Sequence, residues 1–144
     1  MKKKLKNDLA YVDANVFVYP IFYSEDLGLK VKKAKEILQK IEEGEILAYT
    51  STLTWDEVVW AVRKFMGREE SITQGQKLLG FSNLNFITVD ENILCRAQAL
   101  MGNYNLKPRD SIHVSSAIDR KLKTIISDDV DFDKVKEVKR IPLV

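Results

Sequence analysis

The sequence predicts an α/β fold, a three-layer α/β/α sandwich around a mostly parallel sheet. Short apolar runs at residues 9–12, 46–49, 86–89 and 124–127 alternate with longer segments whose apolar residues recur every three or four positions. Short runs of this kind are typical of buried strands, and the longer segments are typical of helices that cover a sheet. Because alternating strands and helices form βα units, we expect helices on both faces of one sheet.

The first half of the chain contains two of the predicted strands, at residues 9–12 and 46–49. Asp13-Ala14-Asn15 follows the first strand, and apolar sequence resumes over 16–22. Residues 31–41 carry apolar side chains at helical spacing, and Gly44 is placed to end this helix. Thr54 then has the character of an N-cap for a helix that runs past Val62.

The second half continues the alternation. A short helix is predicted around 72–79, ending near Gly80, and the third strand follows at 86–89. Residues 92–101 predict a helix that Gly102 stops, and Pro108 suits the first turn of another that runs to about Arg120. The fourth strand covers 124–127, and residues 141–144 predict a last edge strand.

Length and composition indicate one soluble globular domain over residues 1–144. The chain is 45% hydrophobic and 31% charged, and its net charge of +2 does not by itself predict a polyanionic partner. Residues 1–7 predict a flexible basic arm. The apolar runs are far shorter than the roughly 20 residues of a membrane span, and no signal-peptide pattern follows Met1, so we expect no membrane association and a cytoplasmic location. Cys95 lies in an apolar helical pattern that predicts a buried thiol.

Acidic side chains follow the predicted strands. Asp13 comes after the first strand, and Asp128 and Asp129 come after the fourth. Glu57 and Asp110 each lie in the first turn of a predicted helix. Because ligands of open α/β sheets bind beyond the carboxyl ends of the strands, we expect these acids to converge there.

A cluster of carboxylates is unstable unless a cation neutralises it, because like charges raise one another's pKa. Oxygen ligands without a cluster of histidines or cysteines point to Mg²⁺ or Mn²⁺ rather than zinc. Such ions activate water and stabilise the charge that develops on a phosphodiester. The acids therefore predict metal-dependent phosphodiester chemistry.

Four segments together resemble the PIN domain family, and most closely its VapC-type toxin nucleases. They are residues 11–16 (YVDANV), 54–60 (TWDEVVW), 106–113 (LKPRDSIH) and 126–132 (ISDDVDF). The resemblance covers nearly the whole chain and implies an RNase H-like fold. It further implies an endoribonuclease that uses Mg²⁺ or Mn²⁺ to cut RNA, forms a homodimer and is controlled by an antitoxin protein. The acids that match the family's metal-binding and catalytic quartet are Asp13, Glu57, Asp110 and Asp129.

The last of these segments offers two candidates for one position, because Asp128 and Asp129 are adjacent. The spacing to Phe132 favours Asp129, with Asp128 as the alternative ligand. We interpret Asp131 and Asp133 as parts of a solvated acidic loop.

Each candidate also has a structural interpretation. Thr54 to Glu57 is a capping-box pattern, in which Glu57 would bond to the Thr54 amide. Asp110 could complement the dipole of its helix. Asn15 could orient Asp13 or cap the next helix, and we favour the first. Ser127 is a further candidate for supporting the ligands.

Other residues are candidates for contact with RNA. His113, one helical turn beyond Asp110, could face the scissile phosphate, although a packed or surface histidine is the favoured interpretation. Arg109 and the amino-terminal lysines could bind phosphates. Trp55 and Trp60 could stack on bases, but their setting among valines favours the core or a dimer interface.

Two other functions compete with the nuclease. Residues 13–16 faintly resemble the first motif of haloacid-dehalogenase-like phosphatases, but position 15 is Asn where that family has a second aspartate. A PIN-like adaptor that binds RNA or protein without cutting is the non-enzymatic alternative. We also predict a homodimer, because aromatic residues exceed what a small core needs. These are Phe17, Tyr19, Phe22, Trp60 and Phe65.

Overall fold

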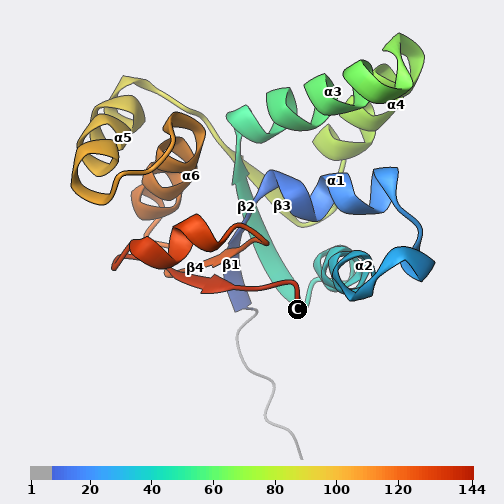
Figure 1. Ribbon diagram of the computed structural model, residues 1–144, viewed down its shortest axis with the longest axis horizontal. Helices are drawn as coiled ribbons and strands as arrows, with labels where there is room; N and C mark the ends of the chain where they lie inside the picture. Colours follow the sequence, from blue (N-terminus) through green and yellow to red (C-terminus); the bar gives the residue numbers. More distant parts are fainter. Residues whose placement is uncertain (1–7) are drawn as a thin grey trace, which may run out of the picture.

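Five strands form one parallel sheet in the order β3-β2-β1-β4-β5 in the computed structural model, which describes residues 8–144 (Figure 1). The predicted basic arm at 1–7 lies outside the described residues. Every neighbouring pair of strands is parallel, which confirms the predicted fold class. The strands are β1 (Asp8–Val12), β2 (Ile46–Ser51), β3 (Leu84–Ile87), β4 (Thr124–Ile126) and β5 (Lys139–Ile141).

Helices cover both faces of this sheet. The strands alternate their side chains between two cores: Ala10 and Val12 of β1 pack on one side, whereas Tyr11 packs on the other. The first core contains residues of α1 (Ala14–Phe22), α2 (Leu29–Glu42), α3 (Thr52–Met66) and α4 (Arg68–Leu79), and the second contains residues of α5 (Glu91–Tyr104), α6 (Pro108–Asp119) and η2 (Val130–Lys134). A short 3-10 helix, η1 (Glu25–Leu27), precedes α2. The arrangement is the predicted α/β/α sandwich.

The order of the strands reverses direction between β1 and β4. From β1 the chain adds β2 and then β3 on one side, and later adds β4 and β5 on the other. In open parallel sheets such a switch point leaves a crevice at the carboxyl ends of the two central strands, and ligands bind there. Asp13 follows β1 and Ser127 follows β4, so both lie at this switch point.

The apolar run at 16–22 is a helix, α1, with Pro20 inside it. The sequence pattern left this run unassigned because a continuous apolar stretch has no period that separates helix from strand. The run is apolar on several sides because α1 packs against both α2 and α3. Its N-cap is Asp13, whose carboxylate accepts a hydrogen bond from the backbone N–H of Ala14.

Several predicted boundaries are wrong by a few residues. Helix α3 begins at Thr52 with Ser51 as its N-cap, so Thr54 does not cap it. Helix α5 continues through Gly102 and ends at Asn105, which adopts the left-handed conformation at φ 54°. Strand β3 lies two residues before the predicted 86–89, and β5 covers 139–141 instead of 141–144.

The environments of three side chains also differ from the prediction. Cys95 is exposed and not a buried thiol. Trp55 and Trp60 are 40% and 53% exposed, so neither belongs to the core of this chain. Among the described residues, none of the helices has the length and apolar character needed to cross a membrane.

Candidate metal and active site

The site is built around Asp13 at the end of β1. Because β1 and β4 are paired in register, the Asp13 backbone N–H donates to the carbonyl of Ile126 at 3.0 Å and brings Ser127 beside the carboxylate. Oδ2 of Asp13 accepts hydrogen bonds from the Ser127 hydroxyl at 2.6 Å and from Nδ2 of Asn15 at 3.2 Å. Burial raises the pKa of Asp13, and the neighbouring His113 and Ser127 offset only part of that rise.

Asn15 and Ser127 therefore both contact the carboxylate of Asp13. Asn15 also donates to the Ser127 hydroxyl at 3.2 Å, and its Oδ1 accepts from the backbone N–H of Asp128 at 3.3 Å. It does not cap α1, because Asp13 occupies that position. The contacts of Asn15 tie the loop after β4 to the loop after β1.

His113 is a buried centre of contacts rather than a surface residue. Its Nε2 lies 2.5 Å from Oε1 of Glu57 and 3.5 Å from Oδ1 of Asp13, and its Nδ1 lies 2.6 Å from the Tyr11 hydroxyl. Burial lowers the pKa of a histidine, but the Tyr11 oxygen and the two carboxylates outweigh it, so the pKa of His113 stands well above its ordinary value. The favoured interpretation, a packed histidine, agrees with this burial.

Glu57 reaches this centre from the second turn of α3. Because α3 begins at Thr52, the proposed capping box does not form. The Thr54 hydroxyl instead lies 2.6 Å from the Thr50 hydroxyl, which donates to the carbonyl of Val12. The carboxylate of Glu57 is directed at His113, with its side chain 21% exposed.

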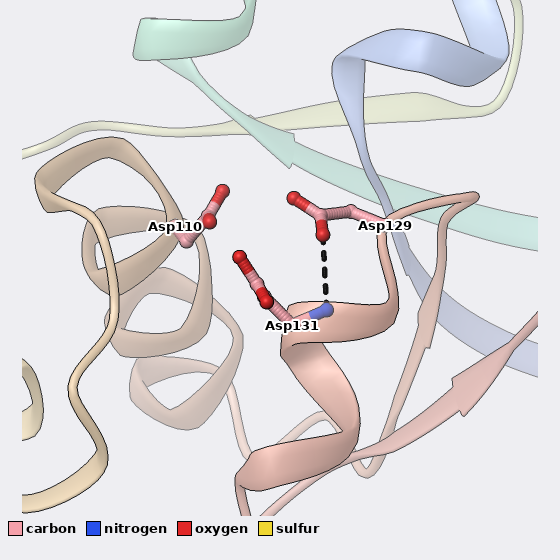
Figure 2. A group of neighbouring side chains, drawn as sticks. All are labelled: Asp110, Asp129 and Asp131. Carbon is pink, nitrogen blue, oxygen red and sulfur yellow. Dashed lines mark hydrogen bonds between the residues drawn. The ribbon is translucent and has the colours of Figure 1, made fainter.

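A second group of acids lies beside the first. One carboxylate oxygen each of Asp110, Asp129 and Asp131 lies within 4.8 Å of the others, and Figure 2 shows the three side chains turned toward a common space. Asp110 comes from the first turn of α6, Asp129 from the loop after β4, and Asp131 from η2. Asp131, interpreted from the sequence as a solvated loop residue, is 27% exposed and also pairs with Nζ of Lys134 at 3.3 Å. Oδ1 of Asp129 accepts from the Asp131 backbone N–H at 2.9 Å, and this turn brings both acids to one place.

Asp110 contributes a buried oxygen atom to this group. Its Oδ2 is buried and has no hydrogen-bond partner within residues 8–144. Burial, together with the charges of Asp129 and Asp13, raises the pKa of Asp110 to about 6. A buried carboxylate oxygen without a donor is costly, and a hard divalent cation is the partner that three clustered carboxylates accept best. These residues fit Mg²⁺ or Mn²⁺.

Asp128 points elsewhere. Its carboxylate accepts a hydrogen bond from the Tyr19 hydroxyl at 2.6 Å and pairs with Nζ of Lys30 at 3.0 Å. It is therefore absent from the three-carboxylate group that Asp129 joins. Arg109, the other candidate beside Asp110, is exposed on the surface of α6.

The loop after β4 is braced from β5. The Ser127 backbone N–H donates to the Ile141 carbonyl at 3.1 Å, and Nη1 of Arg140 donates to the Ser127 carbonyl at 3.1 Å. Arg140 also makes a bidentate pair with Asp133, which lowers the pKa of that carboxyl. Asp133 is exposed, as predicted, and its partner is this arginine.

The structure thus gathers the predicted quartet in two halves. Asp13 and Glu57 meet at His113, whereas Asp110 and Asp129 meet Asp131. The Ser127 hydroxyl joins the halves, because it donates to Asp13 and accepts from the Asp129 backbone N–H at 2.9 Å. Sequence reasoning missed Asp131, although its position one residue before the buried Phe132 signals a short helical turn that brings it back to the site.

Comparisons with known proteins agree with this geometry. Residues 10–138 match the family model described as PIN domain, and no curated protein matches the chain. A toxin–antitoxin complex from Klebsiella pneumoniae contains a similar fold, with a TM-score of 0.64, 24% identity, and coverage of 90% of this chain and 95% of that chain.

Two further solved structures are similar. VapBC2 from Rickettsia felis, bound to a DNA fragment from its promoter, has a TM-score of 0.71 and 14% identity and covers 93% of this chain and 98% of its own. VapC20 from Mycobacterium tuberculosis, described as a toxin that cleaves the sarcin-ricin loop, has a TM-score of 0.69 and 11% identity, over 86% of this chain and 92% of its own. At these identities the likenesses establish the fold.

Proposed function

The chain belongs to the PIN domain family, and from this premise we propose that it is an endoribonuclease that requires Mg²⁺ or Mn²⁺. The observation that carries the proposal is the buried, unpartnered Oδ2 of Asp110, next to the carboxylates of Asp129 and Asp131. Within the described residues, this group combines a clustered negative charge with a polar atom that lacks a partner.

The residues that would hold the ion are Asp110, Asp129 and Asp131 on one side and Asp13 on the other. Glu57 would act directly or through water. A divalent ion in such a site activates water and neutralises charge on a phosphodiester. Ser127 and Asn15 fix the rotamer of Asp13, and His113 fixes Glu57, so the ligand oxygens are held in position before any ion arrives.

The alternatives have less support. The membership of the PIN family leaves no role for a haloacid-dehalogenase-like mechanism. A non-catalytic adaptor would have no need of three clustered carboxylates around an unsatisfied oxygen. The nuclease proposal accounts for both observations.

We further propose that the protein is the toxin of a toxin–antitoxin pair. Similar solved structures are toxin–antitoxin complexes, which supports an antitoxin as partner. An apolar groove of about 330 Å³ between α1, α2, α3 and α4 offers a surface for such a protein. Phe17, Pro20, Leu38, Val58 and Phe81 line it. Binding of an antitoxin protein should weaken when Pro20, which lines this groove, is replaced by Glu.

The test of the nuclease is incubation of purified protein with a mixture of structured and single-stranded RNA, with Mg²⁺, Mn²⁺ or EDTA. Cleavage should require either ion, and protein carrying Asp110→Asn, purified in parallel, should not cleave. This variant is the control for contaminating nuclease. Hydrolysis of a simple phosphomonoester without RNA cleavage would favour the phosphatase, and RNA binding without cleavage would favour the adaptor.

A further inference from the structure

A second hollow lies beside the acids, between α1 and the start of α2. It has a volume of about 520 Å³, which falls in the range of ligand pockets. The side chains that define its chemistry are those of Tyr19, Tyr23, Leu29 and Lys30. Asp110, Asp129 and Asp131 are not among the residues that line this pocket.

Asp128 connects this pocket to the acids. The Asp128 carboxylate holds the Tyr19 hydroxyl at 2.6 Å and Nζ of Lys30 at 3.0 Å, and both of these residues line the pocket. The next residue, Asp129, belongs to the carboxylate cluster. The loop between β4 and η2, which approaches α1 in Figure 1, therefore forms one wall shared by the two sites.

A second chain of contacts joins the same two places. Oδ1 of Asn15 accepts from the Asp128 backbone N–H, and Nδ2 of Asn15 donates to Asp13. The pocket and the acids are thus held in a fixed relation by both backbone and side-chain contacts.

The lining combines two aromatic rings with one cation, Lys30. The rings of Tyr19 and Tyr23 pack edge to face with their centroids 6.2 Å apart, and Tyr23 remains 49% exposed. The Lys30 side chain is 55% exposed, and Lys32 and Lys33 line an adjoining hollow that shares Leu29 with the pocket. Exposed aromatic rings beside cations are the combination that binds single-stranded nucleic acids, through base stacking and phosphate contacts.

We propose that this pocket binds one nucleotide of the substrate RNA, close to the bond that is cut, with its base against Tyr23 and its phosphate at Lys30. The proposal rests on the ribonuclease function proposed above. Asp128 is then a positioning residue, which fixes Tyr19 and Lys30, and not a metal ligand. A protein segment is the competing occupant. The positive charges of Lys30, Lys32 and Lys33 favour RNA, which is a polyanion.

Binding of a fluorescent single-stranded RNA in EDTA, followed by anisotropy, tests the pocket without cleavage. Tyr23→Leu should weaken binding roughly tenfold, because one stacked base is lost, whereas Tyr23→Phe keeps the ring and should bind like the wild type. Lys30→Gln should weaken binding and reduce the slope of log affinity against log salt by about one. The matched control is Lys123→Gln. Lys123 is exposed and lies just before β4, at the amino-terminal end of that strand.

Cleavage with Mn²⁺, measured on the same variants, separates the two proposals. If the wild type cleaves RNA while Tyr23→Leu and Lys30→Gln bind and cleave like it, the pocket is refuted and the nuclease stands. If the wild type does not cleave but Tyr23→Leu binds RNA more weakly, the nuclease fails and the pocket stands. Unchanged RNA binding with weakened antitoxin binding would assign the pocket to protein and overturn the proposal.

Discussion

His113 on α6 binds Glu57 on α3, with 2.5 Å between Nε2 and Oε1. Helices α3 and α6 belong to different layers, on opposite faces of the sheet. The contact therefore joins the two layers at the carboxyl edge of the sheet, where Asp13 also approaches the same nitrogen at 3.5 Å. One buried imidazole thus separates two acids that would otherwise repel each other.

Replacing His113 with Ala should lower the free energy of unfolding in EDTA by about 3 kcal/mol, because it removes the imidazole that lies between the buried Asp13 and the half-buried Glu57. Saturating Mn²⁺ should restore part of the loss. Urea unfolding measures the change. Tyr11→Phe is the control: it removes one hydrogen bond to the same ring and should cost about 1 kcal/mol. A His113→Ala protein as stable as the wild type would contradict the structural role.

In EDTA, stability should fall as the pH rises. The pKa of Asp110 is about 6 in the folded protein and has an ordinary value of 3.8, so between these values the unfolded chain releases the proton first. The free energy of unfolding therefore falls as the pH rises to about 6. The raised pKa values of Asp13 and His113 act in the same direction. The melting temperatures of wild type and Asp110→Asn should diverge between pH 4 and 6.5, with the variant relatively more stable at the higher pH. Addition of 5 mM Mg²⁺ should raise the melting temperature of the wild type alone.

Substituting Asn for Asp13, Asp110 or Asp129 should reduce metal-dependent RNA cleavage by about a thousandfold or more, because the charge that holds the ion is removed. Asn preserves the volume, so circular dichroism should show an intact fold. Glu57→Gln should reduce the cleavage rate less than the aspartate substitutions do, if the Glu57 carboxylate contacts the ion through water. Asp8→Asn is a matched control, because this exposed acid lies at the amino-terminal end of β1, away from Asp13 at the other end of the strand. Cleavage near the wild-type rate by both Asp13→Asn and Asp110→Asn would refute the site.

Asp131 should matter for metal binding more than Asp128. Calorimetric titration with Mn²⁺ should show affinity roughly tenfold weaker or more for Asp131→Asn, because a carboxylate of the cluster is lost. Asp128→Asn should bind the ion like the wild type, because its carboxylate is occupied by Tyr19 and Lys30. Equal losses in the two variants would return Asp128 to the ligand set.

We predict a homodimer that uses α3 and α4. Phe17 lies in the core and does not support this prediction, but Trp60 and Phe65 of α3 are 53% and 70% exposed. Light scattering should give a dimer mass at micromolar concentrations, and Phe65→Glu should convert it to a monomer. Leu94→Glu, an equally apolar exposed position on α5, should leave the dimer intact. A monomeric wild type across this range would exclude the dimer.

The sequence alone predicted the class of fold because the strand and helix periods are distinct in this chain. It also predicted that Asp13 and Asp129 lie at one edge of the sheet, since both follow strands that must be parallel. Helix α1 was not predicted, because packing between two other helices removes the polar face that gives a helix its period.

Side-chain partners were harder to predict than positions. The pattern from Thr54 to Glu57 fits a capping box, but the helix begins earlier because Ser51 ends β2, and Glu57 is then available to His113. Asp131 lies in the carboxylate group and Asp128 does not, because Asp128 contacts Tyr19 whereas the turn after Asp129 brings Asp131 toward Asp110. Such choices depend on tertiary contacts that no local pattern contains.

The contacts between β5 and the loop after β4 have a consequence for the synthesis of the protein. Ser127, which holds Asp13 and the Asp129 backbone, is itself held by Arg140 and Ile141. These two residues are translated after every acid of the site. A nascent chain whose β5 is still inside the exit tunnel therefore lacks the support that positions its acids. We therefore expect the site to be complete only after the last strand has left the tunnel and joined the sheet.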